Sequence, residues 1–229
     1  VDKAQQIVDE IRAEGGTAIA VKANVLDKAS LEQAREEVLK EFGSVDILVN
    51  GAGGNKAQAT TSKDLSFFDL DLDAFKWVFD LNVTGAVLTT MVFGELLAKQ
   101  GYGNVINIAS MASYHPLTNT VAYCGAKAAV ANFTEWMAVH FNKNYSTNIR
   151  VNAIAPGFLL TTQNQFLMQK EDGTPTDRGQ RVLDKTPMAR YGQPEEMAGA
   201  VIWLCSDAAS FVNGAVIPID GGFSAFWGI

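Results

Sequence analysis

The sequence is poor in the residues that build metal sites and disulfide frameworks. Its 229 residues include two cysteines, Cys124 and Cys205, and two histidines, His115 and His140. Their positions match no metal-ligand spacing, so we predict no metal site. Two cysteines are also too few for a disulfide scaffold, and they favour a reduced, cytoplasmic setting.

Long apolar runs and basic clusters are missing as well. The longest apolar run, Ala198–Cys205, is far shorter than a membrane span. The formal net charge is −7, and no run of Lys or Arg offers a surface for phosphate groups. The composition therefore argues against nucleic acids and membranes as partners and leaves a small molecule as the expected ligand.

The apolar residues that are present recur with helical and strand spacings in alternation. They make up 48% of the chain, which suits a single globular domain over residues 1–229. Periodicity predicts helices over residues 1–14, 27–41, 73–99, 121–141 and 195–204, and strands over residues 17–21, 46–50, 104–109, 149–154 and 215–219. This alternation is typical of an α/β fold with a parallel sheet between two layers of helices.

Polar or glycine-bearing residues follow three of the predicted strands. Asn50-Gly51 ends one strand, Ser110 ends the next, and Pro156-Gly157 follows the third. In doubly wound sheets ligands bind at the carboxyl ends of the strands, so we expect these residues to share one crevice. Residues 158–192 interrupt the alternation and are rich in polar side chains, which indicates an active-site lid or, alternatively, a surface loop.

Tyr123 and Lys127 carry the chemistry that this crevice could perform. They are four residues apart on a predicted helix, so their side chains share a face. A neighbouring ammonium lowers the pKa of a phenol and brings it towards the range of a general acid or base. Ser110 could hold the same substrate oxygen. An ordinary half-exposed helix face is the alternative for the pair alone, but the three strand ends favour an active site.

With these motifs in this order, the chain resembles the small, single-domain members of the short-chain dehydrogenase/reductase family. The resemblance extends over the whole chain and rests on Asn50-Gly51-Ala52-Gly53, Asn82, the set Ser110, Tyr123 and Lys127, Pro156-Gly157, Thr161 or Thr162, and Asp220-Gly221-Gly222. It implies a Rossmann-like, doubly wound parallel sheet in a three-layer α/β/α arrangement.

The resemblance also implies a role for each catalytic residue. Tyr123 would pass a proton to or from the reacting oxygen while a nicotinamide passes a hydride. Lys127 would lower the pKa of Tyr123 and bind the nicotinamide ribose, and Ser110 would orient the substrate oxygen. Asn82 would kink the long helix and connect Lys127 to solvent through a water.

The implied cofactor is NAD or NADP. The residues expected to contact it are Asn24, Val25, Asn50, Gly51, Ala52, Tyr123, Lys127, Pro156, Gly157, Thr161 and Thr162. Asn24 departs from the aspartate usual in the family, although its amide oxygen can still accept a hydrogen bond.

One family element has no match, namely the glycine-rich turn that follows the first strand and takes the pyrophosphate. The first βα unit is therefore missing from this chain, and so is the segment after the second strand, whose acidic or basic residue normally selects NAD or NADP. An incomplete chain is the interpretation we favour, because a sheet without that unit would expose an apolar edge. The alternative is a naturally short, catalytically inactive scaffold or interaction protein without cofactor binding.

Residues 54–70 and 158–192 flank the predicted crevice and should shape the substrate pocket. Their amides and cations suit a hydroxylated, carboxylate-bearing substrate, with Lys56, His115, Gln163, Asn164 and Arg178 as candidate contacts. The C-terminal tail resembles the sugar-acid branch of the family, which includes mannonate (fructuronate-type) and gluconate oxidoreductases. The family resemblance further implies a homotetramer or homodimer formed through the two long helices, residues 73–99 and 121–141.

Overall fold

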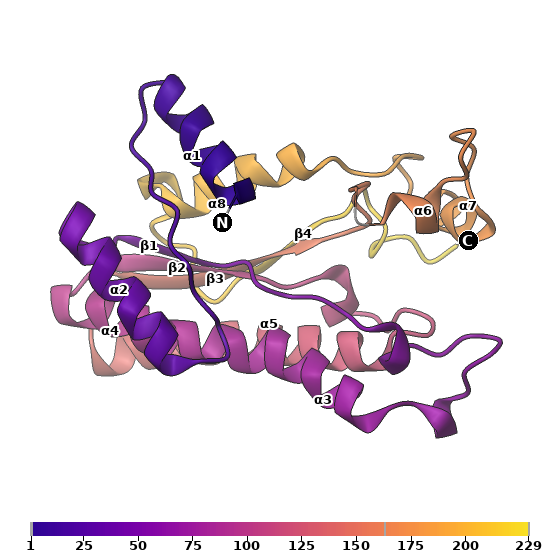
Figure 1. Ribbon diagram of the computed structural model, residues 1–229, viewed down its shortest axis with the longest axis horizontal. Coiled ribbons are helices and arrows are strands. Elements are labelled where there is room, and N and C mark those ends of the chain that lie inside the picture. Colours follow the sequence, from indigo (N-terminus) through magenta and orange to yellow (C-terminus); the bar gives the residue numbers. More distant parts are fainter. Residues whose placement is uncertain (1, 163, 229) are drawn as a thin grey trace.

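A computed structural model describes residues 2–162 and 164–228. Its sheet has four parallel strands in the order β1 (Ile47–Asn50), β2 (Gly103–Ile108), β3 (Ile149–Pro156) and β4 (Val216–Ile219). One face is covered by α2 (Lys28–Phe42), α4 (Gly85–Gln100) and α5 (Val121–Asn144), and the other by α1 (Asp2–Ala13) and α8 (Ala198–Cys205) (Figure 1). The predicted doubly wound, three-layer α/β/α architecture is confirmed.

The strand predicted over residues 17–21 is wrong. This segment is irregular and leads from α1 on one face of the sheet to α2 on the other (Figure 1). A parallel strand is defined by hydrogen bonds to a neighbour, and among the described residues no strand pairs with this segment. β1 is therefore an edge strand of the described sheet, and its side chains Ile47 and Val49 are 46% and 48% exposed.

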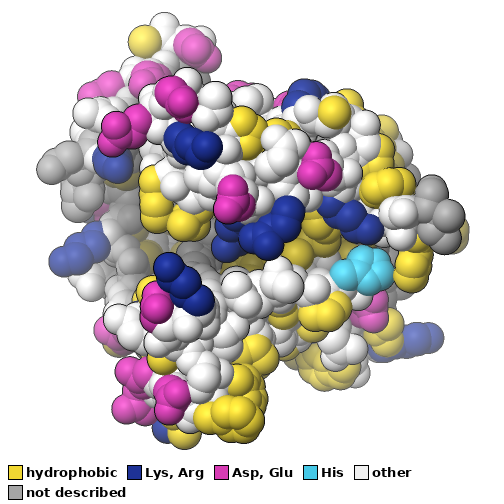
Figure 2. Space-filling view, turned by 90° about the vertical axis from the view of Figure 1, so that its right-hand side faces the viewer, with side chains coloured by type: hydrophobic (Ala, Val, Ile, Leu, Met, Phe, Trp, Pro, Cys, Tyr) yellow, Lys and Arg dark blue, Asp and Glu magenta, His cyan; other side chains and the backbone are white. Residues whose placement is uncertain are grey.

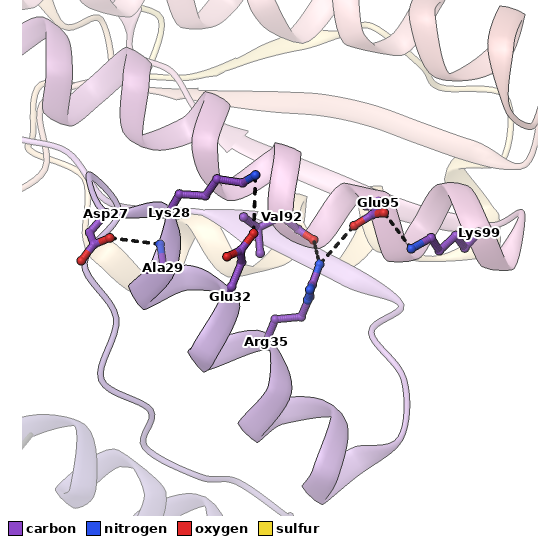
Figure 3. Close-up of polar contacts among 8 residues, drawn as sticks. All are labelled: Asp27, Lys28, Ala29, Glu32, Arg35, Val92, Glu95 and Lys99. Atoms are coloured by element: carbon purple, nitrogen blue, oxygen red, sulfur yellow. Dashed lines mark hydrogen bonds and ion pairs between the residues drawn. The ribbon is translucent and has the colours of Figure 1, made fainter.

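Helix α2 has a capping residue at each end, and Arg35 connects it to α4. It begins after Asp27, whose carboxylate accepts from a backbone N–H in the first turn, and it ends at Gly43, which has a left-handed φ of 79°. Arg35 of α2 donates to Glu95 of α4 at 3.1 Å, and Lys99 pairs with the same carboxylate at 2.7 Å (Figure 3). The Arg35 contact holds α2 against α4, while the Lys99 pair lies within α4.

The helix predicted over residues 73–99 has an irregular turn in the middle. It consists of α3 (Leu72–Phe79), a π-helical turn (Asp80–Thr84) and α4. By length and composition this continuous helix could cross a membrane, with a mean hydropathy of 1.5 over an 18-residue window. Instead it packs within the domain, where α3 lies against α5 and α4 lies against α2 and the sheet. Its apolar character is therefore explained by packing.

A chain of buried side-chain hydrogen bonds connects the sheet to α4 and α5. The Asn50 amide on β1 donates to Thr90 at 2.9 Å and to Asn107 of β2 at 2.8 Å. Asn107 in turn donates to Thr134 of α5 at 2.8 Å. All four side chains are buried. Because each buried amide needs a partner, this chain specifies how both helices sit on the sheet.

The described part of the predicted lid, residues 158–162 and 164–192, has secondary structure and an apolar cluster of its own. It contains two short helices, α6 (Gln165–Met168) and α7 (Asp177–Lys185). Met168, Val182 and Tyr191 form a small apolar cluster of their own within it. The unit lies beyond the carboxyl end of β3 (Figure 1), where a lid over the crevice was predicted.

Replacing Asn107 by leucine should destabilise the fold by about 1–3 kcal/mol, because buried partners on β1 and α5 lose their hydrogen bonds. Asn104→Leu on the same strand is the matched control, since Asn104 lies outside the hydrogen-bond chain: its Nδ2 makes one long bond, to the Cys205 carbonyl oxygen at 3.4 Å, and its buried Oδ1 has no partner among the described residues. Urea unfolding of both variants measures the difference. An equal loss for Asn104→Leu would show that the side-chain shape matters and the hydrogen-bond chain does not.

Candidate active site

Three of the four predicted catalytic residues lie together in one cavity at the carboxyl ends of the strands, and Asn82 does not line it. Ser110 follows β2, and Tyr123 and Lys127 lie in the first two turns of α5. With Pro156 at the end of β3 and Gly157 after it, they line a cavity of about 520 Å³. Figure 2 views this end of the molecule and shows Lys and Arg side chains gathered near the centre of the face.

A tight turn after β2 orients the Ser110 hydroxyl. Its Oγ accepts from the backbone N–H of Ala112 at 3.1 Å, which leaves the hydroxyl proton available for donation. The Ser113 hydroxyl accepts from the Ser110 N–H at 3.3 Å and donates to the Lys127 carbonyl oxygen at 2.7 Å. Ser113 therefore holds the turn against α5, and Ser110 stays beside Tyr123.

Lys127 is a buried cation, and only 5% of its surface is exposed. Its Nζ donates to the Ile108 carbonyl oxygen at 2.7 Å and lies 5.7 Å from the centre of the Tyr123 ring. Burial penalises the charged ammonium and lowers the pKa of Lys127 to about 8. The amine therefore titrates much closer to neutral pH than a surface lysine does.

The pKa of Tyr123 moves in the direction opposite to the one expected from Lys127. Burial of the phenol raises this pKa, and the Ser110 hydroxyl opposes the rise only in part. The expectation of a lowered Tyr123 pKa is therefore wrong for the protein without a cofactor, because removal of the phenol from water is the largest influence on this pKa. The neutral phenol is the form present at neutral pH, and it is a proton donor.

Asn82 occupies the π-helical turn and is 1% exposed. Its Nδ2 donates to the Gly54 carbonyl oxygen at 2.7 Å and to that of Val78 at 2.8 Å. A Cβ added at Gly53 would lie 2.7 Å from Asn82 Oδ1 and 3.3 Å from Lys127 Nζ. The predicted irregularity of the helix at Asn82 is confirmed, and it places the segment after β1 directly beside Lys127. The water relay stays a prediction.

Nine of the eleven residues expected to contact a cofactor line one of two hollows. Val25, Asn50, Gly51 and Ala52 line a small one of about 80 Å³. A side chain added at Gly51 would meet nothing within 4 Å, so a ligand can approach the backbone there. Tyr123, Lys127, Pro156, Gly157 and Thr161 line the large cavity.

Two of the expected cofactor contacts line neither hollow. Thr162 is exposed, and the side-chain oxygen of Asn24 accepts from the Leu26 N–H at 3.0 Å within its own turn. Asn24 thus shapes the segment that carries Val25 into the small hollow.

Two of the five candidate substrate contacts line the large cavity, two do not, and one lies outside the described residues. Arg178 and Asn164 line the large cavity with the catalytic set. Lys56 lies outside it, with Nζ 4.3 Å above the Trp77 ring, and His115 packs beside the Trp227 ring at 6.0 Å. Gln163 lies outside the described residues.

Arg178 and Asn164 differ in what their polar atoms are free to do. Asn164 uses both ends of its amide inside the lid, accepting from Thr161 N–H and donating to the Leu159 carbonyl oxygen. No hydrogen bond or ion pair to any residue in the described ranges 2–162 and 164–228 involves the Arg178 guanidinium. Of the two described candidates that line the cavity, Arg178 is thus the one whose charged group has no partner among the described residues.

Apolar residues form a part of the wall that the sequence analysis missed. Met111, Leu117, Leu167 and Met168 line the cavity, but no motif distinguishes them from ordinary core residues. Among the described lining residues there is no Asp or Glu, and the charged ones are Lys127 and Arg178. The cavity therefore favours an anion over a cation.

The comparisons with known proteins show the family to which the chain belongs. A family model described as enoyl-(acyl carrier protein) reductase matches residues 1–224. The chain belongs to the short-chain dehydrogenase/reductase family, whose members are oxidoreductases that act on CH–OH groups.

The similar proteins include relatives named for sugar acids. The chain is 48% identical over 237 residues to the uncharacterized oxidoreductase UxuB of Bacillus subtilis, covering 100% of this chain and 84% of that protein. A solved structure of a proposed D-mannonate oxidoreductase from Haemophilus influenzae with bound NAD is 46% identical, with a TM-score of 0.90, covering 98% of this chain and 83% of that one. A gluconate 5-dehydrogenase from Burkholderia cenocepacia in complex with NADP and tartrate is 28% identical, with a TM-score of 0.85, covering 98% of this chain and 82% of that one.

The buried charge of Lys127 predicts a pH-dependent stability. Lys127→Met should be more stable than the wild type below pH 8, by on the order of 1–3 kcal/mol, because the wild type buries an ammonium. A folded-state pKa near 8 lies below the 10.5 of the free side chain, so this advantage should shrink as the pH rises through that interval. Urea unfolding from pH 6 to 10.5 measures it, and a constant difference would contradict the assignment.

Proposed function

We propose that this protein is an NAD- or NADP-dependent oxidoreductase that interconverts an alcohol and a ketone on a sugar acid of the mannonate/fructuronate type. The single observation that carries the proposal is the cavity in which Ser110, Tyr123 and Lys127 lie together with Arg178, whose guanidinium has no hydrogen bond or ion pair to a described residue. The first three residues supply proton transfer, and Arg178 supplies a partner for a carboxylate.

The residues present suit a nicotinamide dinucleotide. Lys127, Pro156 and Gly157 surround the space where a nicotinamide riboside would bind, and the open backbone at Gly51 suits the adenosine half. A bound nicotinamide supplies the hydride acceptor or donor. The chain's own residues supply binding, orientation and the proton.

Proton transfer takes place at the Tyr123 hydroxyl. In the reduction direction the neutral phenol donates its proton to the ketone oxygen, and in the oxidation direction the phenolate accepts the proton of the alcohol. Ser110 donates a hydrogen bond to the same oxygen and orients it. Lys127 stabilises the phenolate as it forms, and its lowered pKa lets it release a proton near neutral pH.

The substrate carboxylate binds Arg178 at the lid side of the cavity. A guanidinium can form two parallel hydrogen bonds to a carboxylate, which fixes the orientation of the substrate as well as its charge. The names of the similar proteins from Haemophilus influenzae and Burkholderia cenocepacia support a sugar acid in particular.

Tyr123→Phe should abolish turnover, with kcat reduced by about 100-fold or more, because the proton donor is removed while the ring is kept. The assay follows NADH or NADPH absorbance with aldonates and ketoaldonates as substrates. Circular dichroism and the unfolding temperature of the variant should match the wild type. Retained activity would refute the role assigned to Tyr123.

Arg178→Ala should raise KM for the aldonate by about 10- to 100-fold, since a charge-assisted hydrogen-bond pair is lost. Arg181→Ala is the matched control, because Arg181 lies on the same helix but is exposed and outside the cavity lining. An unchanged KM for every aldonate in Arg178→Ala would remove Arg178 from the site.

The oligomer of the proposed enzyme forms through α4 and α5. Their outer faces enclose an apolar groove of about 380 Å³. Met91 and Trp136, which line it, are 59% and 57% exposed in the single chain. A second copy of the chain covers this groove and removes both side chains from water.

Trp136→Glu should convert the oligomer to a monomer, because the interface would bury an unpaired carboxylate. Light scattering coupled to size exclusion measures the mass. Phe211→Glu is the control for a general effect of added charge, since Phe211 is fully exposed and does not line the groove. An unchanged mass for Trp136→Glu would move the interface elsewhere.

A further inference from the structure

We infer that Tyr191 and Gly179 are positioning residues that hold the backbone of Arg178 beside the cavity. The resulting position of the Arg178 guanidinium sets the preference for carboxylate-bearing substrates. The inference rests on the proposed function and adds to it the device that places the carboxylate partner. Its structural basis is the junction between α6 and α7, where Thr176, Gly179 and Tyr191 all lie against one backbone atom, the carbonyl oxygen of Met168.

The Met168 carbonyl oxygen accepts two hydrogen bonds. One comes from the backbone N–H of Thr176 at 3.0 Å, and the other comes from the Tyr191 hydroxyl at 3.3 Å. Both Met168 and Tyr191 are buried, with 3% and 8% of their surfaces exposed. The end of α6 is therefore tied both to the start of α7 and to the segment that follows it.

Gly179 brings α7 into direct contact with this junction. A Cβ at this position would lie 2.0 Å from the Met168 carbonyl oxygen and 2.5 Å from the Tyr191 hydroxyl. No side chain fits there without moving the helix. The absence of a side chain at Gly179 thus allows the first turn of α7, which carries Arg178, to lie against α6.

Thr176 strengthens the same junction. Its hydroxyl accepts from the Gly179 N–H at 3.0 Å and donates to the Leu167 carbonyl oxygen at 2.7 Å. The first turn of α7 is capped by a side chain that is itself bound to α6. The backbone of Arg178 is consequently fixed by hydrogen bonds of Thr176 before it and Gly179 after it. Leu167 and Met168 line the same cavity as Arg178.

Tyr191 connects this unit to the wall of the cavity near the reacting groups. The next residue, Gly192, donates to the Phe158 carbonyl oxygen at 3.0 Å and accepts from the Leu160 N–H at 2.9 Å. Phe158 follows Pro156-Gly157 and lines the cavity. Hydrogen bonds and the short stretch of chain from Gly192 to Tyr191 therefore connect the end of β3 to Met168 and to the first turn of α7. They fix the backbone from which the Arg178 side chain extends.

Tyr191→Phe and Gly179→Ala test the inference together with Arg178→Ala. Tyr191→Phe removes one oxygen and should raise KM for the aldonate by about 3- to 10-fold, with kcat nearly unchanged. Gly179→Ala displaces α7 and should have a larger effect on the same KM. KM for the corresponding uncharged alditol, which has no carboxylate for Arg178, should stay the same in both variants.

The double variant Arg178→Ala/Tyr191→Phe gives the sharpest readout. If Tyr191 acts through Arg178, its substitution should add nothing to KM once Arg178 is gone. Gly199→Ala on α8, where an added Cβ meets nothing within 4 Å, is the control for a helical glycine. Tyr102→Phe, at an exposed tyrosine outside the cavity, is the control for the hydroxyl.

Three outcomes would overturn the inference. In the first, Arg178→Ala raises the aldonate KM but Tyr191→Phe does not, which leaves the proposed function intact. In the second, Tyr191→Phe raises KM for aldonate and alditol equally, as a merely structural role would. In the third, Arg178→Ala itself has no effect, and the carboxylate site of the proposed function fails together with the inference. Because Tyr191→Phe changes a single atom, the test remains decisive even if Gly179→Ala does not fold.

Discussion

The buried ammonium of Lys127 is the constraint on which the active site depends. A cation with 5% of its surface exposed needs a hydrogen-bond acceptor, and the Ile108 carbonyl oxygen at the end of β2 supplies one. This contact draws the first turns of α5 to the end of β2, where Ser110 begins its turn. Ser113 closes the arrangement by donating to the backbone of Lys127. The lowered pKa of Lys127 and the position of Tyr123 thus have the same origin.

The distribution of charge in the cavity follows from two separate parts of the fold. Lys127 comes from the helix that packs on the sheet, and Arg178 comes from α7, beyond the carboxyl end of β3. With no carboxylate among the described lining residues, the space between them favours an anion. In the proposed function the residues beside the sheet transfer the proton and α7 binds the carboxylate, so a change in α7 would alter the substrate class and leave the chemistry the same.

Much of the fold could be predicted from the sequence because its signals are local. Asp27 and Gly43 define the ends of α2, and the apolar runs of β1 to β4 predicted the strands that the structure contains. The prediction failed for residues 17–21 because a strand needs a paired neighbour, which apolar content alone does not reveal. The two helices of the lid were missed because they are stabilised by contacts with each other, such as Gly179 against the Met168 carbonyl oxygen.

The sequence by itself determined that Tyr123 and Lys127 share a helix face and that Ser110 ends a neighbouring strand, since helical and strand periodicities act within a few residues. Only the tertiary structure decided that Arg178 lines the cavity while Lys56 and His115 do not, because loop side chains are placed by packing between distant segments. It also decided the direction in which the pKa of Tyr123 moves. Desolvation depends on everything that surrounds the phenol, and the spacing to Lys127 cannot predict it.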